Sequence, residues 1–362
     1  MWKRSLLALG LALILISAAA WGFRDRLLLA GLDRAYRLGI AAQGLPQLPD
    51  GLHVGLCGAG SPMPDPGRVG PCVAVLAGSH LFVVDSGPGS TRTLALMGLP
   101  PARAEAVFIS HFHSDHIGDL GELMLQHWAG GAARRPLDIY GPVGVDRVVQ
   151  GFEGAYALDR DYRLRHHAPN VVPPSGFGGA PHPFAIDPAG SPTLVLQAPN
   201  LKVWAFAVDH RPAEPAVGYR FEYKDRVLVI SGDTASTPAL QRAARGADVL
   251  VHEALSPILV AMQRQAALAA GRGNLAAILH DIPSYHSTPE AAADTAQRAG
   301  VRYLLLDHIV PPTPAILDSA FLGDARARFA GPLRVGQDGD FLSMPAGSHE
   351  IRRSNRLRRW PF

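Results

Sequence analysis

The sequence predicts an α/β fold with one main domain, and three observations carry this prediction. Short apolar runs typical of buried strands, such as 81–84 and 106–109, alternate with segments of helical character. The second half of the chain repeats this order. Histidines and carboxylates follow several of the apolar runs directly, as is typical of loops at strand ends. The length of 362 residues allows one large domain or two small ones, and the composition is that of an ordinary globular protein.

The chain begins with an uncharged apolar run. Lys3 and Arg4 precede this run, which extends from Ser5 to Phe23 and, at about 1.5 Å per residue, is long enough to cross a bilayer. We expect an uncleaved membrane anchor with a cytoplasmic N-terminus and the main domain on the periplasmic side. The alternative is a signal segment cleaved after Ala18-Ala19-Ala20, which would release a secreted protein.

Two segments connect this run to the main domain. From residue 24 to residue 40, leucines interleaved with arginines indicate an amphipathic helix, which lies either on a membrane surface or against the domain. The stretch 43–51 contains Pro46 and Pro49 and indicates a linker. We therefore predict three parts: an N-terminal unit over residues 1–50, the main domain over residues 51–346 and a basic tail over residues 347–362.

The densest group of chemically active side chains follows the apolar run 106–109. Within six positions the chain carries His111, His113, Asp115 and His116. Neutral imidazole and ionised carboxylate are the ligands that borderline divalent metals prefer. Four such donors in so short a loop have no packing role on a soluble surface. The sequence therefore predicts a metal site on a loop between a strand and a helix.

This H-x-H-x-D-H run resembles the first metal motif of the metallo-β-lactamase superfamily, and later positions fit the resemblance in the expected order. Asp85, which follows a buried strand and precedes Ser86-Gly87, resembles the carboxylate of the family's V-D-x-G element, which orients a metal-binding histidine. His210 resembles the isolated third histidine of the family. Asp233 resembles the carboxylate that bridges two metals, and His308 resembles the last ligand.

The resemblance implies a fold, a set of ligands and a reaction. The fold is a four-layer αββα sandwich with its site at one rim of two facing sheets. Two divalent ions, of which zinc is expected, would share a hydroxide, and such a pair activates water for hydrolysis. One ion would be held by His111, His113 and His210, the other by Asp115, His116 and His308, with Asp233 bridging them.

Two further motifs resemble the tRNase Z branch of the superfamily. The segment 251–255 resembles its H-E-A-T element, and the segment 285–288 resembles its H-S-T element. The resemblance implies that His286, supported by Glu253, protonates the leaving oxygen of an ester. With Asp115 these two residues form the expected catalytic set. His286 also precedes a predicted helix start, and both roles can hold.

Other features separate the chain from that branch. Its members carry a long tRNA-gripping arm before the bridging aspartate, whereas Tyr219-Arg220 is followed closely by Asp233 here. Their P-x-K-x-R-N loop corresponds to Pro64-Asp65-Pro66-Gly67-Arg68-Val69. This segment keeps the arginine of the motif but has proline in place of the lysine and valine in place of the asparagine. The net charge of +3 comes from the tail, where five arginines face Glu350, so the rest is about neutral. We therefore expect nucleic acid not to be a partner.

The closer resemblance is to arylsulfatase-like members of the same branch, through Gly58-x-Gly60-Ser61-Pro62, Gly218-Tyr219-Arg220-Phe221 and Ser231-Gly232-Asp233-Thr234. The main prediction is therefore a binuclear hydrolase of a small anionic sulfate or phosphate ester. The enzymatic alternatives are a tRNase Z-like phosphodiesterase and a lactone or amide hydrolase, which would not need His286. A non-hydrolytic protein, such as a di-iron redox centre, is a further alternative because the same ligands suit iron.

Four further points concern the cysteines, a proline-rich stretch, the tail and the oligomeric state. The only two cysteines, Cys57 and Cys72, flank a Gly- and Pro-rich loop and either form a disulfide or are two small buried residues. The proline-rich stretch 166–191 is predicted to be a long loop that borders the site. The basic tail is either a solvated end or a salt-sensitive contact with anionic lipid. The oligomeric state is undetermined, and a dimer is one option.

Overall fold

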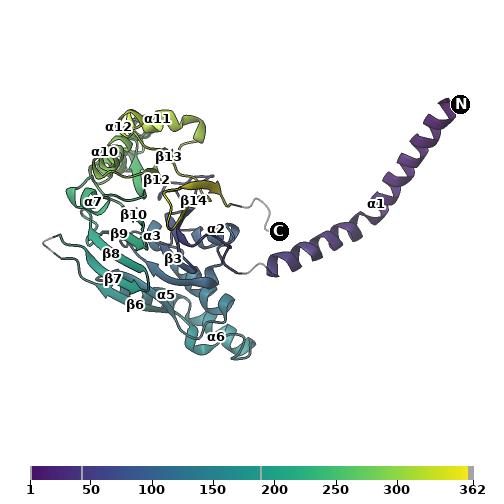
Figure 1. Cartoon of the computed structure of the whole chain (residues 1–362), viewed down its shortest axis with the longest axis horizontal. Coiled ribbons are helices and arrows are strands. Elements are labelled where there is room, and N and C mark those ends of the chain that lie inside the picture. Colours follow the sequence, from purple (N-terminus) through teal and green to yellow (C-terminus); the bar gives the residue numbers. More distant parts are fainter. Residues whose placement is uncertain (1, 42–43, 188–189, 358–362) are drawn as a thin grey trace. The chain divides into compact units, whose positions relative to one another are not determined.

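A computed structural model describes residues 2–41, 44–187 and 190–357, and within the first helix only the backbone of residues 3–5, 7–9, 11–16, 18–20 and 41. The chain divides into two compact units, the first containing residues 1–44 and the second residues 45–358. Each unit is described by itself (Figure 1).

The first unit contains one helix, α1 (Trp2–Ala41). Most side chains of the apolar run 5–23 lie outside the described residues, whereas those from residue 21 onward include charged pairs such as Arg37 with Asp33, 2.8 Å apart. Leu27 and Leu28 are both exposed. Over the residues that the structure describes, no helix combines the length and the apolar character needed to cross a membrane. The predicted membrane anchor and signal segment fall on the run 5–23, most of which lies outside the residues with described side chains, and the described part gives them no support.

Within the described residues, eight strands form the first sheet of the second unit, in the order β15-β14-β1-β2-β3-β4-β5-β6. Strands β15 to β3 pair in antiparallel fashion, and strands β3 to β6 pair in parallel fashion. The strands are β1 (Gly51–Gly58), β2 (Cys72–Ala77), β3 (His80–Val84), β4 (Ala104–Phe108), β5 (Leu137–Pro142), β6 (Gly179–Phe184), β14 (Asp340–Pro345) and β15 (Arg352–Asn355).

The second sheet has seven strands in the described part of the chain, in the order β13-β12-β11-β10-β9-β8-β7. It repeats the mixed pattern, because β7 to β10 are antiparallel and β10 to β13 are parallel. Its strands are β7 (Thr193–Ala198), β8 (Leu201–Ala207), β9 (Val217–Tyr223), β10 (Arg226–Ile230), β11 (Val249–Leu255), β12 (Tyr303–Val310) and β13 (Leu333–Val335).

Helices cover the outer face of each sheet. The longer ones begin at residues that favour helix starts: Thr288 accepts a hydrogen bond from the amide of Ala291, and Pro289 occupies the first turn of α10. The helices are α2 (Ser90–Leu96), α3 (Ser114–Ile117), α4 (Leu120–Leu125), α5 (Val145–Ala155), α6 (Ala157–His166), α7 (Pro238–Ala243), α8 (Pro257–Ala269), α9 (Gly273–Asp281), α10 (Pro289–Ala299), α11 (Asp318–Leu322) and α12 (Ala325–Arg328), with shorter turns η1 (Pro101–Arg103), η2 (Gln126–Gly130), η3 (Pro174–Gly176), η4 (Ile282–Ser284) and η5 (Ala315–Leu317).

Three apolar clusters hold these layers together. The central one lies between the sheets, where Phe82 and Phe108 of the first sheet meet Phe221 of the second. A second cluster joins the outer face of the second sheet to α7, α10, α11 and α12, which lie together on one side of the domain in Figure 1. A third joins the first sheet to α2, α4 and α5. The predicted mixed α/β fold, with two sheets flanked by helices, is confirmed.

Two predictions about local structure were wrong. The stretch 166–191 is not one long loop, because it contains β6, which is the edge strand of its sheet. Pro181 and Pro183 have no amide N–H to donate to a partner strand. An edge strand tolerates such residues because one of its two sides has no partner strand. The basic tail is also partly ordered, since β15 pairs with β14 and extends the sheet beyond the predicted boundary at residue 346.

Candidate metal centre and active site

The predicted metal ligands gather at one rim of the two sheets. They lie on the segments that follow β4, β8 and β10 and on β12 itself, so four separate parts of the chain contribute, and Asp85 joins them from the segment after β3. The turn after β4 carries four of them, and α3 begins within this turn. Side chains that are distant in sequence therefore converge where strands end, as the sequence predicts.

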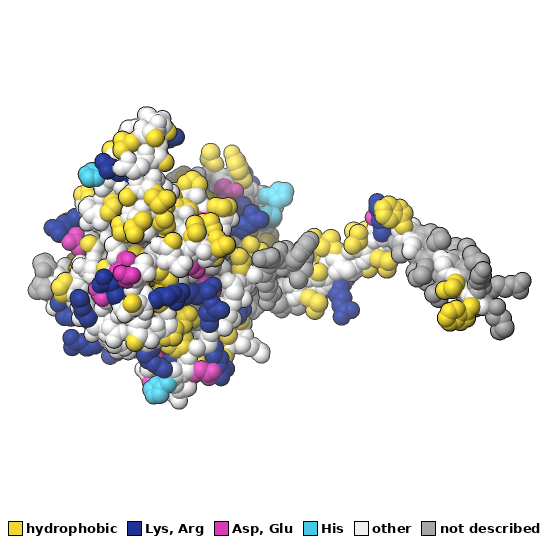
Figure 2. Space-filling view, turned by 90° about the horizontal axis from the view of Figure 1, so that it is seen from above, with side chains coloured by type: hydrophobic (Ala, Val, Ile, Leu, Met, Phe, Trp, Pro, Cys, Tyr) yellow, Lys and Arg dark blue, Asp and Glu magenta, His cyan; other side chains and the backbone are white. Residues whose placement is uncertain are grey.

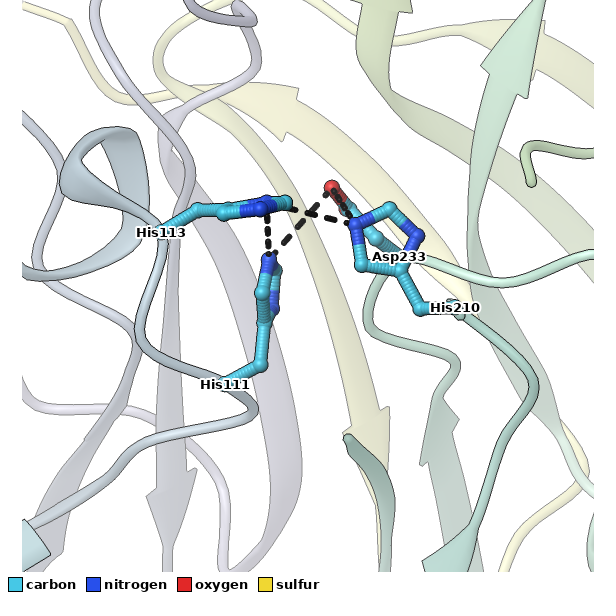
Figure 3. Close-up of side chains that lie close together, drawn as sticks. All are labelled: His111, His113, His210 and Asp233. Atoms are coloured by element: carbon cyan, nitrogen blue, oxygen red, sulfur yellow. Dashed lines mark hydrogen bonds and ion pairs between the residues drawn. The ribbon is translucent and has the colours of Figure 1, made fainter. Parts of the chain in front are cut away.

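One group consists of His111, His113, His210 and Asp233, whose ligand atoms all lie within 4.8 Å of one another. Nε2 of His111 is 3.0 Å and Nε2 of His210 is 3.3 Å from Nδ1 of His113. The Asp233 carboxylate lies 3.9 Å from His111 and 3.8 Å from His210. The four side chains point toward one common place from two sides (Figure 3).

The other group consists of Asp115, His116 and His308. Nε2 of His308 lies 3.3 Å, and Nε2 of His116 lies 3.5 Å, from Oδ2 of Asp115. Both imidazoles also lie 3.2 Å from Oδ2 of Asp233. The same oxygen of Asp233 thus faces both groups, and this position fits a bridging carboxylate.

Contacts on the far side of the rings fix their orientation. Nδ1 of His111 is 3.1 Å from the hydroxyl of Ser110, and Nδ1 of His210 is 3.0 Å from the carbonyl oxygen of Tyr285. Nδ1 of His116 is 2.8 Å from Asp85. These partners leave the opposite nitrogen of each ring for a cation. Ser110 and Tyr285 were missed by the sequence analysis, although Ser110 is the direct neighbour of the first ligand.

The electrostatic surroundings of the first group favour the protonation states that a cation needs. Burial lowers the pKa of His113 and His210, and it lowers the pKa of His111 well below the usual value, so these rings are neutral donors. Burial acts in the opposite sense on Asp233, but the neighbouring His308 and His116 hold its pKa well below the usual range. Neutral His111, His113 and His210 fit one divalent cation. In the other group, burial lowers the pKa of His116 and His308, but the Asp233 carboxylate outweighs it, so the pKa of His116 lies well above the usual value and that of His308 is raised to about 9. These two rings must release a proton when a cation binds.

Two site residues have left-handed backbone conformations. The φ angles of Asp85 and His308 are 58° and 43°. Such conformations cost on the order of 1–3 kcal/mol for residues other than glycine and are found where surrounding structure enforces them. Both side chains contact the metal-ligand groups. The surrounding structure therefore holds these two residues in an unfavourable backbone conformation that directs their side chains toward the site.

A histidine and a glutamate form a pair beside the ligand groups. Nδ1 of His286 is 3.0 Å from Oε1 of Glu253, and the same oxygen accepts hydrogen bonds from the amides of Thr234 and Ser287. Glu253 is buried, and a ring nitrogen of His286 lies within 4.8 Å of ligand atoms of Asp233 and His308. The structure therefore brings this predicted pair to the site. Sequence reasoning missed the two amides that hold the glutamate.

The loop between β1 and β2 lines a cavity of about 530 Å³ that reaches Asp115. Cys57 and Cys72 form a disulfide at the base of this loop. Arg68, which matches the arginine of the P-x-K-x-R-N element, points inward and donates to the carbonyl oxygens of Gly336 and Thr313. This guanidinium is buried, and its hydrogen bonds support the loop.

The sequence matches the model of the Metallo-beta-lactamase superfamily over residues 65–308. The chain belongs to the metallo-beta-lactamase superfamily. This assignment accounts for the two sheets and for the order of the ligand motifs, and it makes the protein one of the superfamily's metal-dependent hydrolases.

Individual members of the superfamily resemble this chain over most of its length. Ribonuclease Z of Mycobacterium bovis is 35% identical over 289 residues, which cover 79% of this chain and 96% of the relative. The metallo-beta-lactamase fold protein YhfI from Bacillus subtilis has a TM-score of 0.56 at 18% identity, covering 81% of this chain and 99% of YhfI. Human tRNase Z, short form, has a TM-score of 0.59 at 22% identity, with coverage of 81% and 99%. The curated relatives thus favour the ribonuclease Z alternative over the arylsulfatase-like prediction.

Proposed function

We propose that the protein is a zinc-dependent phosphodiesterase that cleaves RNA, as the name of its ribonuclease Z relatives suggests. The observation that carries this proposal is the His286–Glu253 pair, 3.0 Å apart, beside the group of Asp233 and His308. Hydrolysis of an ester with a poor leaving group, such as the alkoxide of a ribose, needs a proton donor at this position. Hydrolysis of a lactone or of an activated ester does not require it.

Each residue of the site has a separate task in this reaction. His111, His113 and His210 would hold one cation and Asp115, His116 and His308 the other, with Asp233 facing both, and such a pair would supply Lewis-acid activation of water and charge neutralisation at the phosphate. Because Nδ1 of His286 is engaged by Glu253, Nε2 is the nitrogen that can transfer a proton to the leaving oxygen as the phosphorus–oxygen bond breaks. Glu253, itself held by two amides, keeps the ring oriented and stabilises its protonated form.

This proposal reverses the prediction that nucleic acid is not a partner. The reversal rests on the relatives and not on charge: on the face shown in Figure 2, arginine and lysine side chains are scattered among apolar and acidic ones. One observation favours the second candidate, a small phosphate or sulfate ester. Strands β9 and β10 are joined by Lys224 and Asp225 alone, so no arm for gripping tRNA extends from this hairpin.

A comparison of three substrates tests the proposal. Zinc-loaded protein is offered an RNA with a 3′ extension, bis(p-nitrophenyl) phosphate and an aryl sulfate, with metal-depleted protein as the control. We expect zinc-dependent cleavage of the RNA and of the phosphate diester, and little turnover of the sulfate. Sulfate turnover without RNA cleavage would reject the proposal in favour of the small-ester candidate.

The proposed location of the catalytic domain is outside the cytoplasm. The disulfide between Cys57 and Cys72 supports this location, because disulfides persist in oxidising compartments and are rare in the cytosol. Thiol labelling of the protein in fractionated cells tests it. Labelled, reduced cysteines in a cytosolic fraction would contradict the proposed location.

A further inference from the structure

A second cavity, of about 540 Å³, lies on the outer face of the second sheet beside α7. Its walls are mostly aromatic and aliphatic, with Trp204 and Phe206 from β8 and Ala239 and Ala243 from α7. Cavities of this volume hold small ligands the size of a nucleotide. Phe206 is buried, whereas Trp204 is half-buried and presents part of its indole to the cavity.

A hydrogen-bonded network holds the tryptophan in place. Its Nε1 donates to Oε2 of Glu222 at 3.2 Å, and Arg220 donates to Oε1 of the same carboxylate at 2.8 Å. Arg220 also donates to the carbonyl oxygens of Ala243 and Arg245 at the end of α7. Because the charge of Arg220 is compensated by Glu222, its role is to join the sheet to the helix and to fix the indole.

Two other arginines of the cavity have no such partners. Arg242 and Arg245 are exposed, and among the described residues neither guanidinium has an ion pair or a side-chain hydrogen bond. An aromatic ring held rigidly next to two uncompensated guanidiniums is suited to a base that stacks and to phosphates that carry negative charge. An uncharged apolar ligand would leave both arginines unused.

Two short stretches of chain connect the cavity to the metal-ligand groups and limit the distance between them. Phe206 precedes His210 by four residues, so their Cα atoms are at most about 14 Å apart. Ala239 follows Asp233 by six residues, which allows at most about 22 Å. A single RNA strand bound at the metal centre can therefore also reach this cavity.

We propose that this cavity binds a nucleotide of the RNA substrate away from the scissile phosphate, with its base on Trp204 and its phosphates near Arg242 and Arg245. This inference rests on the proposed phosphodiesterase function and assigns its substrate contact to residues other than the metal ligands. Residues of α7 and β8 would then contribute to substrate binding. The β9–β10 hairpin of this chain is too short to supply an arm for that purpose.

Variants of the tryptophan and of the arginine pair test the contact. Trp204→Ala is expected to raise KM for RNA about 5- to 100-fold with little change in kcat, because stacking contributes to binding and not to the chemical step. Trp204→Phe, which keeps an aromatic ring, is expected to lose less. Turnover of bis(p-nitrophenyl) phosphate is expected to be unchanged in both variants, since this substrate is too short to reach the cavity.

The arginine pair has a matched control. In Arg242→Gln/Arg245→Gln, the slope of log K for RNA binding against log salt should fall in magnitude by about 1.4, for two lost phosphate contacts on a single strand. Arg134 and Arg135 are likewise exposed and line a separate cavity at the starts of β3, β4 and β8. Their double glutamine variant should leave the slope unchanged.

The outcomes separate this inference from the proposed function. Unchanged RNA binding and KM in the Trp204 and Arg242/Arg245 variants, or an equal effect of the Arg134/Arg135 control, would overturn the inference. Wild-type protein that binds RNA but does not cleave it would reject the proposed function, and weakened binding in the variants would then still support the cavity as a nucleotide site. Wild-type protein that neither binds nor cleaves RNA would reject both.

Discussion

The Asp85 carboxylate lies 2.8 Å from Nδ1 of His116 and accepts two hydrogen bonds from Ser110, one from its amide and one from its hydroxyl. The carboxylate thus joins the end of β3 to the loop that carries the metal ligands. It leaves Nε2 of His116 pointing toward Asp233. One buried side chain therefore positions both ends of the ligand loop.

Replacing this carboxylate tests its role. Asp85→Asn should lower metal affinity or turnover about 10- to 100-fold, because an amide cannot accept hydrogen bonds at both former oxygens and weakens the basicity of His116. Metal titration of the purified protein and its kcat/KM measure the effect. Asp138→Asn is a matched control, since Asp138 also contacts a histidine, His182, at 2.8 Å, but this pair is exposed and contributes no ligand. Equal losses in the two variants would contradict a role for Asp85 at the centre.

Asp233→Ala should have a larger effect. Its Oδ2 faces imidazoles of both ligand groups, so its removal would take away the carboxylate placed to offset the mutual repulsion of two bound cations, which would be strong in a buried site. We expect the metal content to fall to one ion per chain or fewer and the hydrolysis to be abolished. Elemental analysis with parallel assays measures both. Full metal content with normal turnover would show that Asp233 does not bridge.

Local motifs made much of the site predictable. His111, His113, Asp115 and His116 stand within six positions, and the turn after one strand brings them together whatever the rest of the chain does. The distant ligands were predicted from family resemblance. The structure gives a physical reason for their convergence, since they lie at strand ends on one rim of the two sheets.

Features that depend on tertiary contacts were not predictable. β6 contains prolines that argue against a strand, and only its edge position makes them tolerable. β15 consists of polar and basic residues without alternation, and it forms because β14 offers a free edge. The inward orientation of Arg68 likewise depends on Gly336 and Thr313, which are more than 200 positions away.

The disulfide is expected to stabilise the fold. Cys57 and Cys72 close a loop with a sequence separation of 15 residues and are both buried. For such a loop, Cys57→Ala/Cys72→Ala should lower the free energy of unfolding by about 3 kcal/mol. Urea unfolding of oxidised wild type and of the double variant measures the difference. If wild type handled without reductant had the same free energy of unfolding as the double variant, the two thiols would not be joined in a disulfide.

His286→Ala separates proton donation from metal binding. Because His286 is placed as the proton donor, its loss should leave metal content intact and should impair each substrate according to how much its leaving group needs a proton. A ribose or alkyl alkoxide needs one, so the loss should be about 10²- to 10⁴-fold for RNA and alkyl esters. A p-nitrophenolate leaves unaided near neutral pH, and the loss for nitrophenyl diesters should be clearly smaller.

Glu253→Gln and an exposed histidine complete this test. The glutamine keeps a hydrogen-bonding oxygen near Nδ1 of His286 but lacks the negative charge that stabilises the protonated ring, so the same ranking of substrates is expected with smaller losses. His280→Ala, on the exposed face of α9, should change neither metal content nor turnover. Equal losses for good and poor leaving groups in His286→Ala would assign this residue to substrate binding. Loss of metal would assign it to the ligand group that it shares with Asp233 and His308.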